Sequence, residues 1–376
     1  MKSMKYYKFL LLLGCVIPSL LLCSCDDDND SVNPIVLSKV TTIGDLDVPI
    51  QEAALGDFIA VHGTGLDMRN IDSIFVNDVR VELSEVYTEN DIVYLKIPVK
   101  LPSAETNKIY FYNKLGVNEI PFQTNAPDLK LERMFNEYTR PGDTLMIYGD
   151  FFTLYEIDSL NGVVDFDGKI SKVISSGNNY LTTKVPLDVD QNIKVKVKGL
   201  KHKVEAVCPG RYYDREMMIL DFDELMPSNP VNVVTDPQDP ARLSGNFLRI
   251  DQHSAYSGWW YIAEKGSIPY TDDMLDNDQD YVVKCEFRTA NQFIEGKIRF
   301  CNYLFWDAAP MFWVPSDFTI QNFDRWETIT LPFVVNRSGT YKDNFYYSSF
   351  NMRLEIDPSI ARNFAIDNIR ICKKGD

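Results

Sequence analysis

The chain contains an internal repeat, and this feature limits its fold more than any other. Residues 56–63 read Gly-Asp, then mostly apolar residues, then a closing Gly, and residues 142–149 repeat that pattern. Two later runs recur at a similar offset of roughly 84 to 90 residues, 94–99 as 181–187 and 108–113 as 193–198. The sequence therefore predicts two copies of one domain, over residues 34–125 and 126–212.

Each copy consists of short β-branched and aromatic runs separated by Gly, Asn, Asp and Pro, with no long stretch of helical period. This pattern predicts an all-β protein. A length of about 90 residues per copy fits a small immunoglobulin-like sandwich. The pattern Gly-Asp-x-h-x-h-x-Gly-x-x-h, where h is apolar, resembles that of IPT/TIG domains at residues 56–66 and 142–152. The resemblance implies a role in spacing, dimerisation or binding, and we interpret both copies as spacers.

The charge of the chain excludes a role in nucleic-acid binding. Its 54 acidic and 38 basic residues give a formal net charge of -16, whereas phosphate backbones are bound by clustered Lys and Arg. The hydrophobic share of 45% and the charged share of 24% are those of a folded globular protein. We therefore expect a folded protein whose partner is not a polyanion.

Residues 1–24 have the composition of a lipoprotein signal peptide. Three lysines precede an apolar run, 9–22, that is too short to span a bilayer as a helix. The run ends Leu-Cys-Ser-Cys, which resembles the lipobox of bacterial lipoproteins. Cys25 is the predicted lipid anchor, with Cys23 as the alternative.

An acidic tether follows at residues 25–33, and it resembles the export tag of surface lipoproteins. We therefore expect a lipoprotein exposed at the cell surface and anchored in the outer membrane. Cleavage before Cys25 would remove three lysines and no acid, leaving 35 basic and 54 acidic residues and a net charge of -19.

The third segment, residues 213–376, differs from the repeats because it holds all five tryptophans, between Trp259 and Trp326. Short β-type runs predict a β-sandwich of the jelly-roll kind. The predicted strands are 217–223, 247–250, 281–289, 297–304, 327–333, 352–355 and 364–371.

Three of these runs, 219–223, 326–333 and 364–371, resemble strands of carbohydrate-binding jelly rolls. The whole arrangement of lipobox, two IPT/TIG-like domains and a Trp-rich sandwich resembles surface glycan-binding lipoproteins of bacterial polysaccharide-utilisation systems. The resemblance implies a non-catalytic protein that binds xyloglucan or mixed-linkage β-glucan, with β-mannan next. It also implies an outer-membrane glycan importer and companion surface proteins as partners.

Aromatic side chains are the candidate binding groups, because a sugar ring has an apolar face and a rim of hydroxyl groups. Trp259, Trp260 and Tyr261 follow a Gly, and on a regular strand the two tryptophans belong to opposite faces. Residues 302–315 hold five rings, more than one strand can bury. The sequence predicts glycan-binding residues at Trp259, Trp260, Tyr261, Trp306, Trp313, Arg299 and Asn302, and it places Trp326 in the core.

Two further features leave alternatives open. Cys285 and Cys301 flank a turn signal, so a tight hairpin would place them opposite one another, either as a disulfide or as two packed thiols. No cofactor is required by any motif. The resemblance to carbohydrate-binding jelly rolls implies that a structural calcium ion would lie near Asp221, Asp223 and Asp367.

No sequence signature of catalysis accompanies the aromatic segment. Glycoside hydrolysis needs a suitably spaced pair of carboxylates, but 54 acidic residues provide pairs in any fold. His253 lacks an elbow or oxyanion motif around it. We therefore predict a non-enzyme, and the alternative function is an adhesin or assembly subunit that binds a protein partner.

Overall fold

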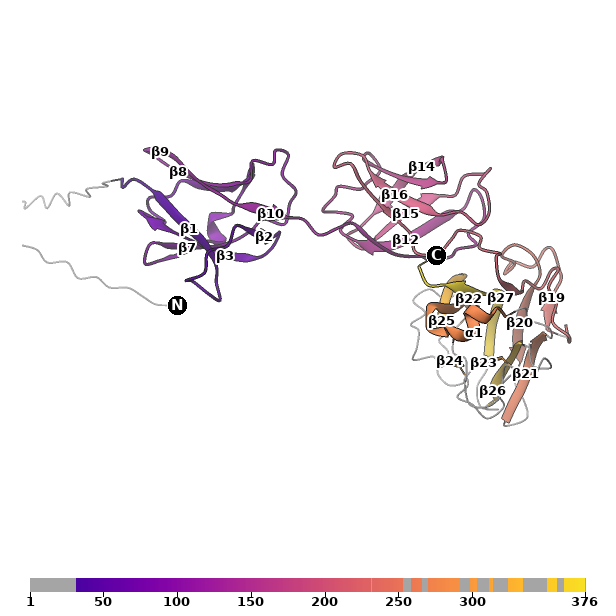
Figure 1. Ribbon diagram of the computed structural model, residues 1–376. Coiled ribbons are helices and arrows are strands. Elements are labelled where there is room, and N and C mark those ends of the chain that lie inside the picture. Colours follow the sequence, from indigo (N-terminus) through magenta and orange to yellow (C-terminus); the bar gives the residue numbers. More distant parts are fainter. Residues whose placement is uncertain are drawn as a thin grey trace, which may run out of the picture. The chain divides into compact units, whose positions relative to one another are not determined.

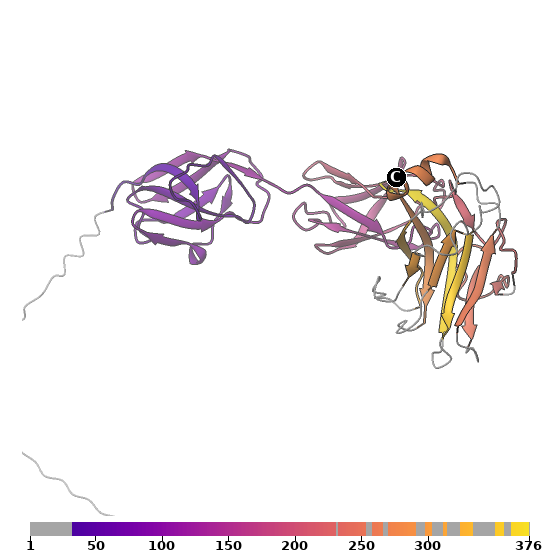
Figure 2. The ribbon, with the colours of Figure 1, turned by 60° about the horizontal axis from the view of Figure 1, so that its bottom comes forward.

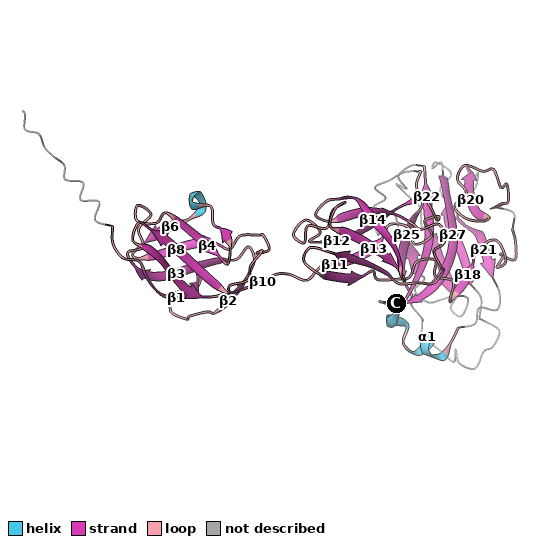
Figure 3. Ribbon diagram, turned by 90° about the horizontal axis from the view of Figure 1, so that it is seen from above, coloured by secondary structure: helices cyan, strands magenta, loops and turns pink. Residues whose placement is uncertain are grey.

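The computed structural model describes residues 32–230, 232–252, 258–265, 270–290, 298–302, 311–313, 324–333, 350–356 and 362–375. Strands dominate this part of the chain, and the helices are short (Figure 3). None of its helices has the length and apolar character needed to cross a membrane. The chain forms two compact units, the first ending at Thr124 and the second made of the residues from Asn125 onward together with Val99–Leu101.

The first unit is a β-sandwich around one core. Its main sheets have the orders β1-β3-β7-β6 and β5-β4-β8-β9, and β10 pairs with β2 (Figure 1). Its elements are β1 (Val36–Thr42), β2 (Glu52–Ala54), β3 (Phe58–Thr64), β4 (Ser73–Val76), β5 (Val79–Arg80), η1 (Leu83–Glu85), β6 (Tyr87–Glu89), β7 (Ile92–Lys96), β8 (Lys108–Asn113), β9 (Gly116–Pro121) and β10 (Gln123–Asn125).

The second unit starts with the second repeat, which forms one seven-stranded sheet of order β11-β12-β15-β14-β13-β16-β17. Residues from both halves of this sheet share a single buried core, so the sheet closes over itself. Its strands are β11 (Lys130–Met134), β12 (Thr144–Asp150), β13 (Gly162–Phe166), β14 (Lys169–Ser176), β15 (Tyr180–Lys184), β16 (Val195–Gly199) and β17 (Val204–Val207).

The repeated glycines have the same structural role in both copies. Gly63 on β3 and Gly149 on β12 each lie beside a register shift in the neighbouring strand. A methyl group at Gly63 would lie 2.2 Å from the carbonyl O of Val36, and one at Gly149 would lie 2.2 Å from that of Lys130. The backbones approach so closely that only glycine fits, which explains why the pattern recurs.

Replacing Gly63 with alanine is expected to lower the free energy of unfolding of the first unit by about 1–3 kcal/mol, as overpacking usually does. Differential scanning calorimetry of the full chain measures this. Gly44→Ala is the matched control, because nothing lies within 4 Å of a methyl group there. Equal melting temperatures for the two variants would contradict the steric account.

The C-terminal domain completes the second unit as a two-sheet sandwich, which confirms the predicted all-β class (Figures 1 and 2). One sheet has the order β19-β20-β27-β22-β25, with β18 also on β27, and the other has the order β21-β26-β23-β24. Its elements are β18 (Met218–Leu220), β19 (Val233–Val234), β20 (Phe247–Gln252), β21 (Gly258–Lys265), α1 (Asp272–Asp276), η2 (Asp278–Asp280), β22 (Tyr281–Thr289), β23 (Ile298–Asn302), β24 (Met311–Trp313), β25 (Glu327–Pro332), β26 (Phe350–Ile356) and β27 (Arg362–Lys373).

The predicted hairpin between Cys285 and Cys301 is wrong. Cys285 lies on β22 and Cys301 on β23, and these consecutive strands belong to different sheets. Cys285 is a free, fully buried thiol, and burial raises its pKa. The chain crosses from one layer of the sandwich to the other after β22, so sequence symmetry about a turn does not imply strand pairing.

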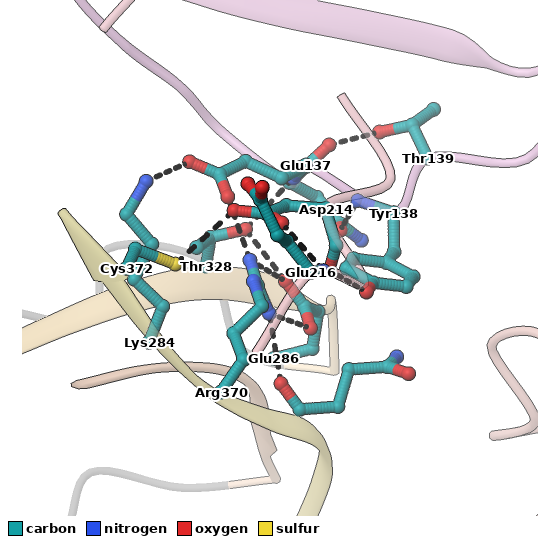
Figure 4. Close-up of polar contacts among 12 residues, drawn as sticks. Glu137, Tyr138, Thr139, Asp214, Glu216, Lys284, Glu286, Thr328, Arg370 and Cys372 are labelled. Atoms are coloured by element: carbon teal, nitrogen blue, oxygen red, sulfur yellow. Dashed lines mark hydrogen bonds and ion pairs between the residues drawn. The ribbon is translucent and has the colours of Figure 1, made fainter. Parts of the chain in front are cut away.

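A buried cluster of charges joins the second repeat to the C-terminal domain (Figure 4). We call Glu137, Lys284, Glu286 and Arg370 the junction cluster. The Arg370 guanidinium donates to Glu137 Oε2 at 2.6 Å and to Glu286 Oε2 at 2.9 Å, and Lys284 Nζ lies 2.5 Å from Glu137 Oε1. Two cations thus balance two carboxylates across the domain boundary.

The junction cluster lies in a largely solvent-free environment. Arg370 and Glu286 are each 0% exposed, and Glu137 is 3% exposed. Burial alone would lower the pKa of Arg370, but the carboxylates of Glu286 and Glu137 raise it well above its ordinary value. Thr328 adds to the junction because its hydroxyl accepts a hydrogen bond from the backbone N–H of Glu137 at 2.7 Å and donates one to Glu286 at 2.9 Å. The two domains are therefore held together by specific buried contacts.

Candidate functional site

Six of the seven predicted glycan-binding residues lie on one sheet, β21-β26-β23-β24. This sheet is formed from segments that are far apart in sequence (Figure 2). Strand β21 carries Trp259, Trp260 and Tyr261, strand β23 carries Arg299 and Asn302, and strand β24 ends at Trp313. Trp306 lies outside the described residues, as do the predicted lipid anchor Cys25 and His253.

Strand register sorts these positions into rows across the sheet. Trp260 pairs with Leu354, Leu354 pairs with Ile298, and Ile298 pairs with Trp313. The next row runs from Tyr261 through Arg353 and Arg299 to Phe312. Trp259 pairs with Glu355, two positions along β26 from Arg353.

Buried neighbours identify which face of the sheet covers the core. Met352 is 0% exposed and its pairing partner Ala263 is 3% exposed, and both belong to the hydrophobic core of this domain. Directly paired positions share a face, and successive positions along a strand belong to opposite faces. A register shift between Tyr261 and Ala263 interrupts this alternation along β21, so the faces are read from β26. Position 354, and with it the row of Trp260 and Trp313, therefore belongs to the core face.

The row of Tyr261, Arg353, Arg299 and Phe312 belongs to the opposite face by the same alternation, and so does Trp259. The sequence of β26 supports this independently. It alternates Asn351, Arg353 and Glu355 with Met352, Leu354 and Ile356, and strict alternation of polar and apolar residues is typical of a half-buried strand. We call the four positions of this row, 261, 299, 312 and 353, together with position 259 on the same face, the outer row.

Of the outer row, the sequence predicted Trp259, Tyr261 and Arg299 as glycan-binding residues but did not single out Arg353 and Phe312. The signal for Arg353 is the polar alternation of residues 351–355, which by itself indicates only a strand. Asn302 pairs with Phe350, which shares the face of Met352, so this residue is separated from the outer row. The predicted site is thus one sheet, and its members divide between the two faces.

Trp326 lies in the core, as the sequence predicted. It is 9% exposed, its indole Nε1 donates to the carbonyl O of Ala241 at 2.6 Å, and its ring meets Phe247 edge to face at 5.7 Å. Its neighbours include Tyr138 of the second repeat. Trp326 therefore helps to join the two domains.

The three aspartates considered for calcium are used for local structure. Asp221 Oδ1 accepts hydrogen bonds from the backbone N–H groups of Asp223, Glu224 and Leu225. Its Oδ2 accepts a hydrogen bond from the Arg215 guanidinium at 2.6 Å. Burial works to raise the pKa of Asp221, but these donors lower it overall. Across the part of the chain that the structure describes, no group of three or more His, Cys, Asp or Glu residues could hold a metal ion.

Asp367 has a different environment from Asp221. It is 1% exposed, its Oδ1 accepts a hydrogen bond from the backbone N–H of Asn368 at 2.8 Å, and its Oδ2 has no hydrogen-bond partner among the described residues. Burial raises its pKa well above the ordinary value, and the carboxylate of Glu286 raises it further. The hydrogen bond that the Asp367 carboxylate accepts thus comes from the backbone of the next residue.

A comparison with known protein families found one model that matches the C-terminal domain. Residues 212–373 match the family model described as the surface glycan-binding protein B xyloglucan binding domain. A search of curated proteins found no match.

Two solved structures share the fold of most of the chain. Surface glycan-binding protein B of Prevotella bryantii is 18% identical, with a TM-score of 0.59 over 91% of this chain and 99% of that chain. The SGBP-B from a complex xyloglucan utilization locus in Bacteroides uniformis is 16% identical, with a TM-score of 0.50 over 91% of this chain and 100% of that chain. Residues 212–373 are thus similar to the surface glycan-binding protein B xyloglucan binding domain, and most of the chain shares the fold of these two structures.

Proposed function

We propose that the chain is a non-catalytic cell-surface protein that captures a plant cell-wall polysaccharide through the outer row of its C-terminal domain. The observation that carries this proposal is the match of residues 212–373 to the family model. The strand register supports the proposed location, because positions with candidate rings and polar groups share the sheet face opposite Met352. The two repeats serve as spacers.

The chemistry of the outer row suits a neutral sugar chain. Trp259, Tyr261 and Phe312 supply rings that can stack on the apolar faces of sugars, and Arg299 and Arg353 supply donors for hydroxyl groups. Covering one sugar face removes on the order of 60–100 Å² from water, which contributes roughly 2 kcal/mol at about 25 cal/mol per Å². Two or three such contacts, less the cost of association, predict Kd values between micromolar and millimolar.

Xyloglucan is the first candidate ligand, because the matching family is described as a xyloglucan binding domain. Mixed-linkage β-glucan is proposed beside it, and β-mannan comes next. A lipid anchor at Cys25 would hold the protein at the outer membrane, near an importer that takes up the captured glycan. Repeated engagement of a long polymer then raises the effective affinity of a weak site.

Affinity electrophoresis tests the proposal. The full chain is run in native gels that contain xyloglucan, mixed-linkage β-glucan or β-mannan, and we expect retardation in the xyloglucan gel. Reducing-sugar release is measured on the same polysaccharides and is expected to stay at background. Retardation by none of the three glycans would contradict the proposal and favour an adhesin, and sugar release would contradict the non-catalytic role.

A further inference from the structure

A groove at the boundary between the second repeat and the C-terminal domain carries an unusual charge. It encloses about 420 Å³, within the range of small-ligand pockets. Four arginines line it, Arg140, Arg242, Arg288 and Arg325, against two aspartates, Asp143 and Asp324. The lining therefore has a formal net charge of +2, four minus two, in a chain whose net charge is -16.

The local carboxylates leave much of this positive charge uncompensated. The Oδ1 atom of Asp324 lies 3.6 Å from Nη2 of Arg288, which is longer than a hydrogen bond. Among the described residues, Arg242 and Arg325 form no ion pair, and Arg325 lies over the ring of Phe135 at 5.1 Å. Arg325 also acts electrostatically on Glu327, but that carboxylate already pairs with Arg133 at 2.7 Å. Arg249, in a neighbouring hollow, shows the contrast because Asp239 holds it at 2.6 and 2.8 Å.

Contacts across the boundary hold the groove in shape. The Arg140 guanidinium donates to the carbonyl oxygens of Leu243 and Arg242, which ties the second repeat to the loop before β20. The backbone N–H of Thr328 donates to the carbonyl O of Phe135 at 2.8 Å. The Trp326 ring, which also lines the groove, is held by the hydrogen bond from its Nε1 to the carbonyl O of Ala241. A site between domains is thus preformed.

The lining combines groups that recognise a carboxylate with groups that recognise hydroxyls. A guanidinium matches a carboxylate through two parallel N–H donors. Asn136, Thr139 and Thr144 also line the groove, and their side chains carry amide and hydroxyl groups. A sugar that bears a carboxylate presents both kinds of partner in a volume of this size.

We propose that this groove is a second carbohydrate site, which binds an acidic sugar such as a uronic acid residue. Arg242 and Arg325 pair with its carboxylate, and Asn136 and Thr144 contact its hydroxyls. The outer row takes neutral sugars on a different sheet, so the two sites together would let the protein hold a glycan with acidic units. This proposal goes beyond the neutral-glycan function and does not depend on it.

Isothermal titration calorimetry of the full chain with trigalacturonate tests the acidic site. We expect binding that weakens as NaCl is raised, and no binding of the fully methyl-esterified trisaccharide, which lacks the charge. The double variant Arg242→Gln/Arg325→Gln is expected to lose affinity at least tenfold. The single variant Arg325→Gln is expected to lose affinity severalfold. Because Arg325 is exposed, this variant should fold, and it tests the site even if the double variant does not.

Two control variants show whether binding is specific to this groove. Arg80→Gln removes one exposed positive charge in the first unit and is expected to bind trigalacturonate like the natural chain, as is Tyr261→Ala. No heat with trigalacturonate, equal binding of the ester, or unchanged binding by both arginine variants would overturn the proposal. Tighter binding of tri-aspartate than of trigalacturonate would overturn it in favour of a protein partner.

Discussion

Replacing Arg370 with methionine is expected to lower the free energy of unfolding of the second unit by about 3–5 kcal/mol, since it leaves two buried carboxylates without their shared cation. Glu137 and Glu286 are 3% and 0% exposed, so water cannot replace the guanidinium. Urea unfolding followed by tryptophan fluorescence measures the loss, because all five tryptophans lie in the C-terminal domain.

Lys201→Met is the matched control for the junction cluster. Its ion pair with Glu156 has the same 2.6 Å separation as that between Arg370 and Glu137, but the side chains of Lys201 and Glu156 are 47% and 38% exposed. Exposed pairs contribute little, so we expect an almost unchanged unfolding midpoint. If Arg370→Met were as harmless as Lys201→Met, the junction cluster would not hold the two domains together.

Replacing both Trp259 and Tyr261 with alanine is expected to abolish retardation by xyloglucan while the unfolding midpoint stays close to that of the natural chain. The reason is that both positions belong to the outer row, whose rings would contact sugar rather than the core. Loss of two stacking contacts of roughly 2 kcal/mol each corresponds to an affinity decrease of about a thousandfold. Affinity electrophoresis and urea unfolding of the same preparation give the two readouts.

Trp260→Ala is the matched control for the outer row, because it removes the neighbouring ring from the core-face row. We expect a loss of about 3–5 kcal/mol in the free energy of unfolding, the range of Trp to Ala changes at core positions. The remaining folded protein should still be retarded. A stable Trp260→Ala variant without binding, beside a binding-competent Trp259→Ala/Tyr261→Ala variant, would reverse the assignment of faces.

Local patterns were enough to predict much of the fold. The strand predicted at 281–289 coincides with β22, and those at 327–333 and 364–371 coincide closely with β25 and β27. These strands are long runs of apolar or alternating residues, and their residues form the core. Strand β24 has only three residues and lies in a dense aromatic segment, where the sequence has no period that marks a strand.

Pairing between strands was harder to predict than the strands themselves. The symmetric spacing of Cys285 and Cys301 indicated a hairpin, whereas their strands belong to two different sheets. Which Trp faces the core depends on the partner of β21, and that partner is β26, roughly 95 residues later in the chain. Local sequence does not contain this register.

The junction cluster could not be predicted from local patterns either. Along β22, Lys284 and Glu286 alternate with Val283, Cys285 and Phe287, a pattern typical of a strand with one solvated face. The second repeat covers that face instead, and Glu137 meets Arg370 across a separation of 233 residues. Long-range contacts of this kind depend on how two domains meet.

Calorimetric titration of the full chain with a xyloglucan oligosaccharide tests the central claim most directly. We expect saturable binding with a Kd between micromolar and millimolar, lost in the Trp259→Ala/Tyr261→Ala variant. Absence of binding by the folded natural chain, at xyloglucan concentrations well above this range, would contradict the claim that its C-terminal domain captures xyloglucan.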